Sequence, residues 1–104
     1  INSQLQGIAA LAKANGAKLY LLVYPWPAQL VYESNVVNWE EFMSGVCSDV
    51  QCAGVIDIFP RFKAIKNADP GWYERLYVQG DMHYNGKGNR LVADEVLSFL
   101  AAHP

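Results

Sequence analysis

An acidic residue and a histidine stand two positions apart in a segment whose residue types suit proton transfer. Residues 78–85 read VQGDMHYN, with Asp81 and His83 in the middle. If these two lie on extended backbone, their side chains leave the same side of it, because side chains alternate along a strand. The carboxylate can then accept a hydrogen bond from one ring N–H, which leaves the other ring nitrogen free. The spacing therefore predicts a general base with the group that orients it.

A simpler explanation for the pair is a polar turn that caps the next helix, since Asp-x-His also arises by chance. A metal site would need a further ligand, and none stands close in the sequence. Gly80, Asn85 and the apolar helix behind them favour catalysis. Our candidate catalytic residues are therefore His83 and Asp81, and we expect no metal and no cofactor.

The first elements that must position this pair are a helix and a strand. Apolar residues recur at helical spacing between Leu5 and Ala12, and Gly16 supplies a stop. Residues 19–24 are apolar at every position, which is typical of a strand covered on both faces in a parallel sheet. Pro25 and Pro27 end that strand, since each fixes its own φ.

The middle of the chain repeats this alternation. Residues 28–37 are predicted to be a loop, and Asn38 is predicted to cap a helix whose apolar stripe runs over 39–46. Residues 55–59 predict a second buried strand, which Pro60 ends. The order of elements is typical of an α/β protein with parallel strands.

The last third of the chain reads as a turn over 68–71, a brief extended piece over 76–78 and a final helix from about Asn85. Gly86 and Gly88 do not follow a strand in the form of a phosphate-binding loop. We interpret them as room for close packing in the first helical turn.

Two strands alone cannot cover both faces and both edges of a parallel sheet. We therefore expect the chain to be the C-terminal part of a larger doubly wound sheet. The missing strands would come from upstream residues or from a second chain. The chain starts at Ile1 without a methionine, so we expect the natural protein to begin further upstream.

Composition excludes several classes of protein. The 104 residues are 52% hydrophobic, which is enough for a packed core. The net charge is −2 and no basic run occurs, so we expect no nucleic-acid or anionic-membrane surface. No apolar stretch reaches the roughly 20 residues that a membrane span requires.

The two cysteines, Cys47 and Cys52, leave two alternatives open. They are either buried free thiols or a short-loop disulfide. A disulfide would favour an extracytoplasmic location, periplasmic or secreted, and the compartment is otherwise unknown.

Residues 80–85, GDMHYN, followed by Gly88-Asn89 and an apolar helix, resemble the last block of the SGNH (GDSL-like) hydrolase and O-acyltransferase superfamily. The variant concerned is G-D-x-H-[WFY]-N-x-x-G-[HN], in which Tyr84 stands where Trp is usual. The resemblance implies a three-layer α/β/α fold, flavodoxin-like, with residues 1–104 as the C-terminal portion of a single SGNH-like domain.

The resemblance also implies a Ser-His-Asp mechanism acting on an ester-bearing small molecule, a lipid or an O-acylated carbohydrate. By position, His83 would be the general base and Asp81 its orienter. None of the five serines lies in a Gly-Asp-Ser or Gly-x-Ser-x-Gly setting. We therefore expect the nucleophile on the missing N-terminal portion, in the same or a second chain, and this chain alone to be inactive.

Two aromatic residues are predicted to bind substrate. Trp26 follows the end of a predicted strand, where open α/β sheets place their ligands, although it could instead cover the sheet edge. Tyr84 stands next to the base and could line the same pocket or pack under the last helix. Alternative functions are an SGNH-like glycan-binding module without catalysis and a fragment of a nucleotide-binding domain.

Overall fold

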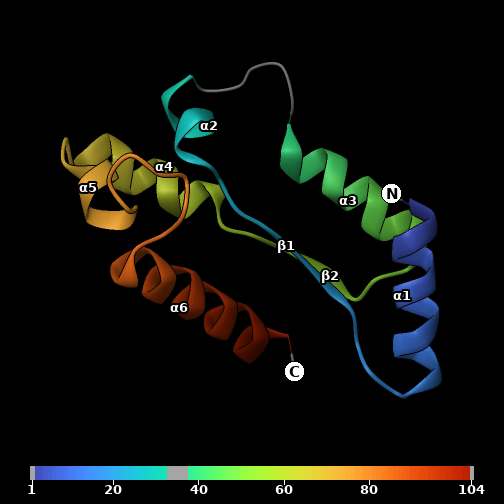
Figure 1. Ribbon diagram of the computed structural model, residues 1–104. Coiled ribbons are helices and arrows are strands. Elements are labelled where there is room, and N and C mark those ends of the chain that lie inside the picture. Colours follow the sequence, from blue (N-terminus) through green and yellow to red (C-terminus); the bar gives the residue numbers. More distant parts are fainter. Residues whose placement is uncertain (1, 33–37, 104) are drawn as a thin grey trace. The chain divides into compact units, whose positions relative to one another are not determined.

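The computed structural model describes residues 2–32 and 38–103, and Ile1, 33–37 and Pro104 lie outside the described part. Over these ranges the chain is a mixed α/β protein with six helices and an open, two-stranded parallel sheet (Figure 1). It divides into two compact units, unit 1 (residues 1–23 and 35–57) and unit 2 (residues 24–34 and 58–104). The predicted α/β class and the two parallel strands are confirmed.

The sheet belongs to unit 1 and joins β1 (Tyr20–Val23) to β2 (Gly54–Asp57) in parallel, with Tyr20 opposite Gly54. Both strands lie within two residues of their predicted positions. The prediction that both faces of the first strand are covered is wrong at Leu22, which is 38% exposed between buried neighbours. Because successive side chains of a strand point to opposite faces, an uncovered face leaves its side chains exposed even when the sequence is apolar throughout.

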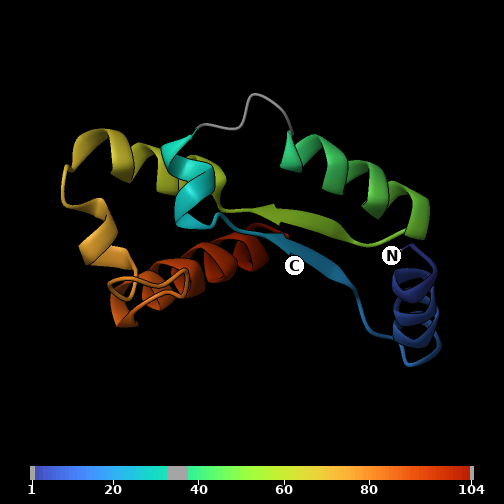
Figure 2. The same cartoon turned by 45° about the horizontal axis from the view of Figure 1, so that its top comes forward.

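Two helices complete unit 1, α1 (Asn2–Ala14) and α3 (Trp39–Val50). The helix α3 packs along both strands and against α1, and Figure 2 shows it running beside β2. Asn38 begins α3 as predicted, because its side-chain oxygen accepts a hydrogen bond from the Glu41 N–H at 3.0 Å. The core of this unit is built on Leu21, Val46 and Cys47.

Both helices of unit 1 end in a left-handed residue. At Gly16, with φ of 67°, the next amide, Ala17 N–H, donates to Ala12 C=O at 2.8 Å, so the predicted stop is confirmed. At the end of α3 the left-handed position is held by Gln51, with φ of 58°.

The end of α3 is also closed covalently. The Cys52 N–H donates to the Cys47 C=O at 2.9 Å, and the same two residues form a disulfide. Of the two alternatives left open for the cysteines, the structure contains the disulfide. Helix ends of this type usually place an apolar contact between these two positions, and here the disulfide takes its place.

The described part of unit 2 contains four helices: α2 (Pro27–Val31), α4 (Phe59–Ala68), α5 (Trp72–Leu76) and α6 (Gly86–Ala102). The prediction of a loop over 28–37 is wrong for its first part, because α2 occupies it; residues 33–37 lie outside the described part. Pro27 starts α2, where the missing N–H costs nothing, and the Gln29 side chain accepts from the Trp26 N–H at 2.7 Å.

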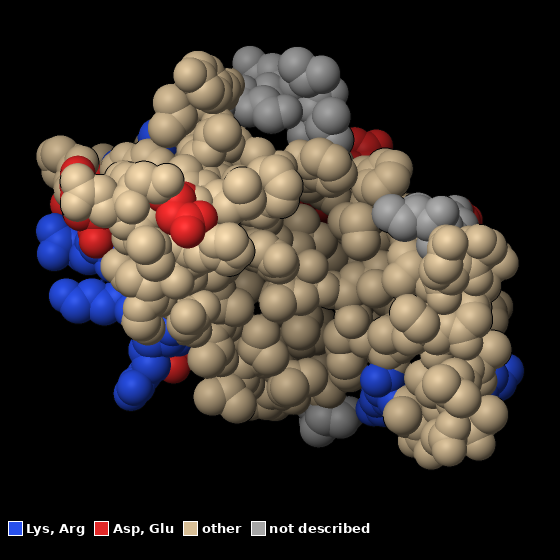
Figure 3. Space-filling view, in the orientation of Figure 1, with Lys and Arg blue, Asp and Glu red and all other residues tan. Residues whose placement is uncertain are grey.

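Charged side chains of both signs stand together on unit 2, as the left part of Figure 3 shows. Arg61 on α4 lies 3.4 Å from Glu95 on α6. The guanidinium of Arg75 pairs with Oδ2 of Asp69. Oδ1 of Asp69 accepts a hydrogen bond from the Gly71 N–H at 2.9 Å, which confirms the predicted turn at 68–71. The arginine hydrogen bond lowers the pKa of the Asp69 carboxyl, which therefore stays ionised.

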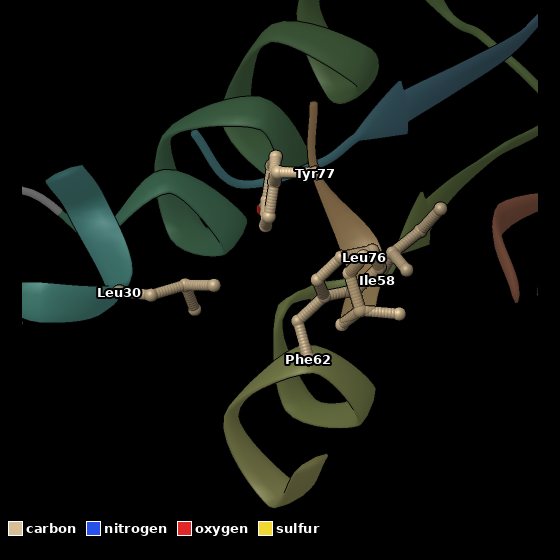
Figure 4. Packing of buried hydrophobic residues seen from close by; sticks show 5 residues of the cluster. All are labelled: Leu30, Ile58, Phe62, Leu76 and Tyr77. Atoms are coloured by element: carbon tan, nitrogen blue, oxygen red, sulfur yellow. The ribbon is translucent and has the colours of Figure 1, made fainter. Parts of the chain in front are cut away.

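The core of unit 2 combines side chains from all parts of its chain. Ile58, Phe62 and Leu76 lie against one another in Figure 4, and the first two are fully buried. Fully burying an aliphatic or aromatic side chain contributes roughly 1.5–3 kcal/mol. The five buried members are Leu30, Ile58, Phe62, Leu76 and Tyr77.

The start of α6 approaches the end of α5 at Gly88, the one buried residue of α6. A β-carbon on Gly88 would collide with the backbone oxygen of Leu76 and come within 3.0 Å of the Tyr84 side chain. At Gly86 nothing lies within 4 Å of that position. The predicted close packing is therefore confirmed at Gly88 and wrong at Gly86.

These two glycines provide a matched test of the contact. We expect Gly88→Ala to lower the free energy of unfolding by on the order of 3 kcal/mol, because a rigid backbone atom must move. Gly86→Ala should change it by less than about 1 kcal/mol. Urea denaturation followed by circular dichroism measures both, and equal stability of the two variants would contradict the contact.

Candidate active site

The candidate site lies on the connection between α5 and α6. A short backbone ladder closes this connection: the Val78 N–H donates to the His83 C=O at 2.9 Å, and the Asn85 N–H donates to the Leu76 C=O at 3.0 Å. Residues 78–83, which we name the Asp–His loop, stand out beyond the ladder. The predicted extended piece over 76–78 reduces to one antiparallel bridge between Tyr77 and Tyr84, because Leu76 still belongs to α5.

A tight turn forms the first half of the Asp–His loop. The Asp81 N–H donates to the Val78 C=O at 3.0 Å, and Gly80 has φ of 76°. A positive φ at the third residue of such a turn favours glycine, which has no side chain to clash. Gly80 thus sets the direction in which Asp81 leaves the turn.

Asp81 and His83 meet as the sequence predicts. The carboxylate oxygen Oδ1 of Asp81 lies 2.8 Å from the ring nitrogen Nδ1 of His83. The route differs from the prediction, because residues 81–83 form bends and no strand. The same Oδ1 accepts from the Met82 N–H at 2.6 Å, so the carboxylate folds over the backbone that follows it.

These donors determine the charge of the Asp81 carboxyl. The hydrogen bond from His83, followed by the backbone N–H of Met82, lowers the pKa of the Asp81 carboxyl, so it is ionised at neutral pH. An ionised carboxylate can only accept, so Nδ1 of His83 carries the proton, and in the neutral form of the ring Nε2 carries the lone pair. The His83 side chain is 78% exposed, and Nε2 has no hydrogen-bond partner among the described residues.

Asn85 anchors the backbone where the Asp–His loop leads into α6. Its side-chain oxygen accepts from the Gly88 N–H at 2.9 Å, which confirms the predicted cap of the last helix. Its side-chain amide faces the carbonyl oxygens of Arg75 at 3.0 Å and Glu74 at 3.2 Å. One side chain thus satisfies backbone groups at the end of α5 and at the start of α6.

The carbonyl oxygen of Pro25 accepts two phenolic hydrogen bonds, from Tyr77 at 2.9 Å and from Tyr84 at 3.0 Å. Burial raises the pKa of both phenols, so both keep the proton that they donate. The Tyr84 ring lies 5.3 Å from that of Phe62, centroid to centroid. The structure therefore places Tyr84 in the packing of unit 2, with its hydroxyl engaged.

Trp26 follows Pro25 and is 52% exposed. It borders an open hollow of about 370 Å³, which reaches the Asp–His loop. We name this space the Trp26 hollow; it is lined by Trp26, Pro27, Ala28, Tyr73, Gly80, Asp81 and Met82. Of the two predicted substrate-binding aromatics, Trp26 is the one that lines this hollow.

Two residues of this arrangement have no signal in the sequence. Tyr77 bonds to a carbonyl 52 positions away, and the Tyr73 hydroxyl contacts the backbone of the Asp–His loop. Neither contact follows from local spacing, because each depends on how the elements pack.

A nucleophile does not stand beside His83 in the described part of unit 2, whose single serine is Ser98. Ser98 lies twelve residues after Gly86 on α6, which puts it ~18 Å along the helix axis from that end. The described residues also contain no group of three His, Cys, Asp or Glu able to hold a metal ion. Among the helices of the described part, none has the length and apolar character needed to cross a membrane.

Comparison with known proteins identifies no relative of this chain. No family model, no curated protein and no solved structure matches the chain.

The electrostatics of the pair predict a titration. In His83→Ala the pKa of the Asp81 carboxyl should rise toward its ordinary value of about 3.9, because the strongest donor is lost while the backbone donors remain. Since folding lowers this pKa, the pair stabilises the protein above the unfolded-state pKa and ceases to do so as pH falls through the folded-state pKa. Carboxyl ¹³C NMR measures the shift.

Met82→Ala is the matched control for this titration, because it removes a neighbouring side chain and keeps the backbone N–H that contacts Asp81. The Asp81 pKa should stay unchanged in that variant. An Asp81 that titrates alike with and without the His83 ring would contradict the pairing.

Proposed function

We propose that this chain carries the histidine–aspartate half of a serine-dependent acyl-transfer site, in an ester hydrolase or O-acyltransferase of the SGNH type. One observation carries the proposal: Asp81 Oδ1 lies 2.8 Å from His83 Nδ1, with the opposite ring nitrogen directed away from its orienting acid. This is the arrangement that a general base needs.

In the proposed reaction Nε2 of His83 takes the proton of a serine hydroxyl as the serine oxygen attacks the ester carbonyl. The imidazolium then returns that proton to the departing alkoxide, and an acyl-serine remains. Water in a hydrolase, or a sugar hydroxyl in a transferase, attacks the acyl group by the same proton route. Asp81 stays ionised and stabilises the imidazolium, and proton transfer by a positioned base contributes roughly 10²–10⁴-fold in rate.

The serine is proposed to come from the nucleophile-bearing N-terminal portion of the domain, in the same or a second chain. Two features support this. Ser98 stands too far along α6 to reach His83, and the sheet is open, with two strands in the described part. A sheet this small normally continues with further strands. The proposed complete domain is the three-layer α/β/α sandwich that the sequence resemblance implies.

The Trp26 hollow is the proposed place for the substrate, an ester-bearing small molecule, a lipid or an O-acylated carbohydrate. The half-exposed indole gives a sugar ring or an acyl chain an apolar face beside the Asp–His loop. The same hollow supports the second candidate, a glycan-binding module without catalysis, because an indole binds sugars without a base.

The catalytic proposal is tested with His83→Ala in the natural protein that contains this chain. We expect hydrolysis of p-nitrophenyl acetate to fall at least about 100-fold, because the general base is removed. The fold should persist, since the His83 side chain is 78% exposed.

His103→Ala is the matched control, because His103 lies beyond the end of α6 and its ring contacts the Phe99 carbonyl of that helix. It should retain full activity. A His83→Ala protein that hydrolyses the ester at a near-normal rate would refute the assignment.

The Trp26 hollow is tested with Trp26→Ala against Trp26→Tyr. Loss of the indole should raise KM roughly 10-fold or more with little change in kcat, because the ring touches substrate and takes no part in proton transfer. The tyrosine variant keeps an aromatic face and should recover most of the affinity. Equal KM values in all three proteins would remove Trp26 from the site. Glycan binding through Trp26 in a protein without esterase activity would favour the non-catalytic module.

A further inference from the structure

We propose that Tyr73 is a positioning residue, whose phenolic hydroxyl holds the Asp–His loop in the conformation in which Asp81 meets His83. This role of Tyr73 deepens the proposed function, and its expected effect on reaction rate rests on that function. The expected effect of Tyr73 on the conformation of the loop does not.

The hydroxyl of Tyr73 lies among the backbone groups of the turn. It accepts a hydrogen bond from the Asp81 N–H at 3.0 Å, and it lies 3.0 Å from the Asp81 C=O and 3.1 Å from the Val78 C=O. A hydroxyl has one proton to donate and can accept at the same time. Tyr73 therefore links the backbone on both sides of the turn that contains Gly80.

The Asp–His loop needs such a link because burial does not hold it. All six of its residues are exposed, and its turn contains a glycine with positive φ. Glycine gives the turn wide backbone freedom, and within the turn one hydrogen bond, from the Asp81 N–H to the Val78 C=O, restricts it. The contact between Asp81 and His83 depends on the backbone between them, so a loosened loop separates the pair for part of the time.

The phenol is itself held firmly. Tyr73 projects from α5, and its ring stacks on that of Tyr77, with centroids 5.8 Å apart and planes 17° from parallel. Trp72 meets Tyr77 edge-on at 6.0 Å, and Tyr77 is 1% exposed. The ring of Tyr73 thus packs against the core of unit 2, and its hydroxyl is hydrogen-bonded to the Asp–His loop.

Removing the hydroxyl alone separates the two roles of this residue. Tyr73→Phe keeps the ring and its stacking, so the core and α5 should remain intact. Only a fraction of molecules would then hold Asp81 against His83, and the observed rate scales with that fraction. We expect kcat to fall roughly 5–10-fold, the rate equivalent of one lost hydrogen bond, with KM changed less than about 2-fold.

The experiment uses the natural protein with Tyr73→Phe, and with Tyr32→Phe as the matched control. Tyr32 also belongs to unit 2, follows α2 and is 81% exposed, and among the described residues no hydrogen bond joins its side chain to the Asp–His loop. The first readout is the proton NMR signal of His83 Nδ1–H, assigned by its absence in His83→Ala. The second is kcat and KM for ester hydrolysis.

A weakened Nδ1–H signal and a lowered kcat in Tyr73→Phe, with both unchanged in Tyr32→Phe, support the proposal. A signal and a kcat equal to those of the control overturn it. A weakened signal with unchanged kcat, in a protein whose activity depends on His83, overturns the positioning role. If His83→Ala itself retains activity, the proposed function fails, and the NMR signal still decides whether Tyr73 holds the loop.

Discussion

The candidate site depends on a two-rung backbone ladder at the junction of α5 and α6. One rung joins Val78 to His83, and the other joins Leu76 to Asn85. The ladder makes the chain between the rungs project as a loop, in which Asp81 and His83 lie close enough for their side chains to meet. The position of the loop is set by the packing of α6 against the end of α5, where Gly88 lets α6 approach the carbonyl of Leu76.

Polar contacts, more than burial, give the site its shape. The Asp–His loop is exposed throughout, whereas the hydrogen bonds of Asn85, Tyr73 and the Pro25 carbonyl anchor its surroundings to a buried aromatic cluster. A rigid base beneath a solvent-exposed imidazole suits proton transfer, because the reacting nitrogen stays accessible while its orientation is restricted.

Unit 1 solves a similar problem of chain reversal in two ways. Gly16 and Gln51 both take the left-handed conformation after a helix, but only the glycine adopts it without steric cost. At Gln51 the disulfide between Cys47 and Cys52 spans the same turn. A cross-link over such a short loop contributes about 2 kcal/mol through the unfolded chain, which is enough to offset the cost of a non-glycine residue there.

The sequence by itself determined the features whose partners lie within a few residues. The caps Asn38 and Asn85, the stop at Gly16 and the pairing of Asp81 with His83 all depend on local backbone geometry, and all were predictable. Both strands were predictable from their apolar runs, although their pairing brings Tyr20 opposite the distant Gly54. The short helices α2 and α5 escaped prediction because five residues carry too little periodicity to separate a helix from a loop.

Only the tertiary structure decided what surrounds the pair. Pro25 receives hydrogen bonds from residues 52 and 59 positions away, which no local pattern encodes. The same packing places the Tyr84 ring in the core and leaves the Trp26 ring at the hollow, although the sequence predicted both as substrate-binding residues. The physical reason is that local hydrogen bonds act through the connected backbone, whereas these contacts exist only once separate helices have packed together.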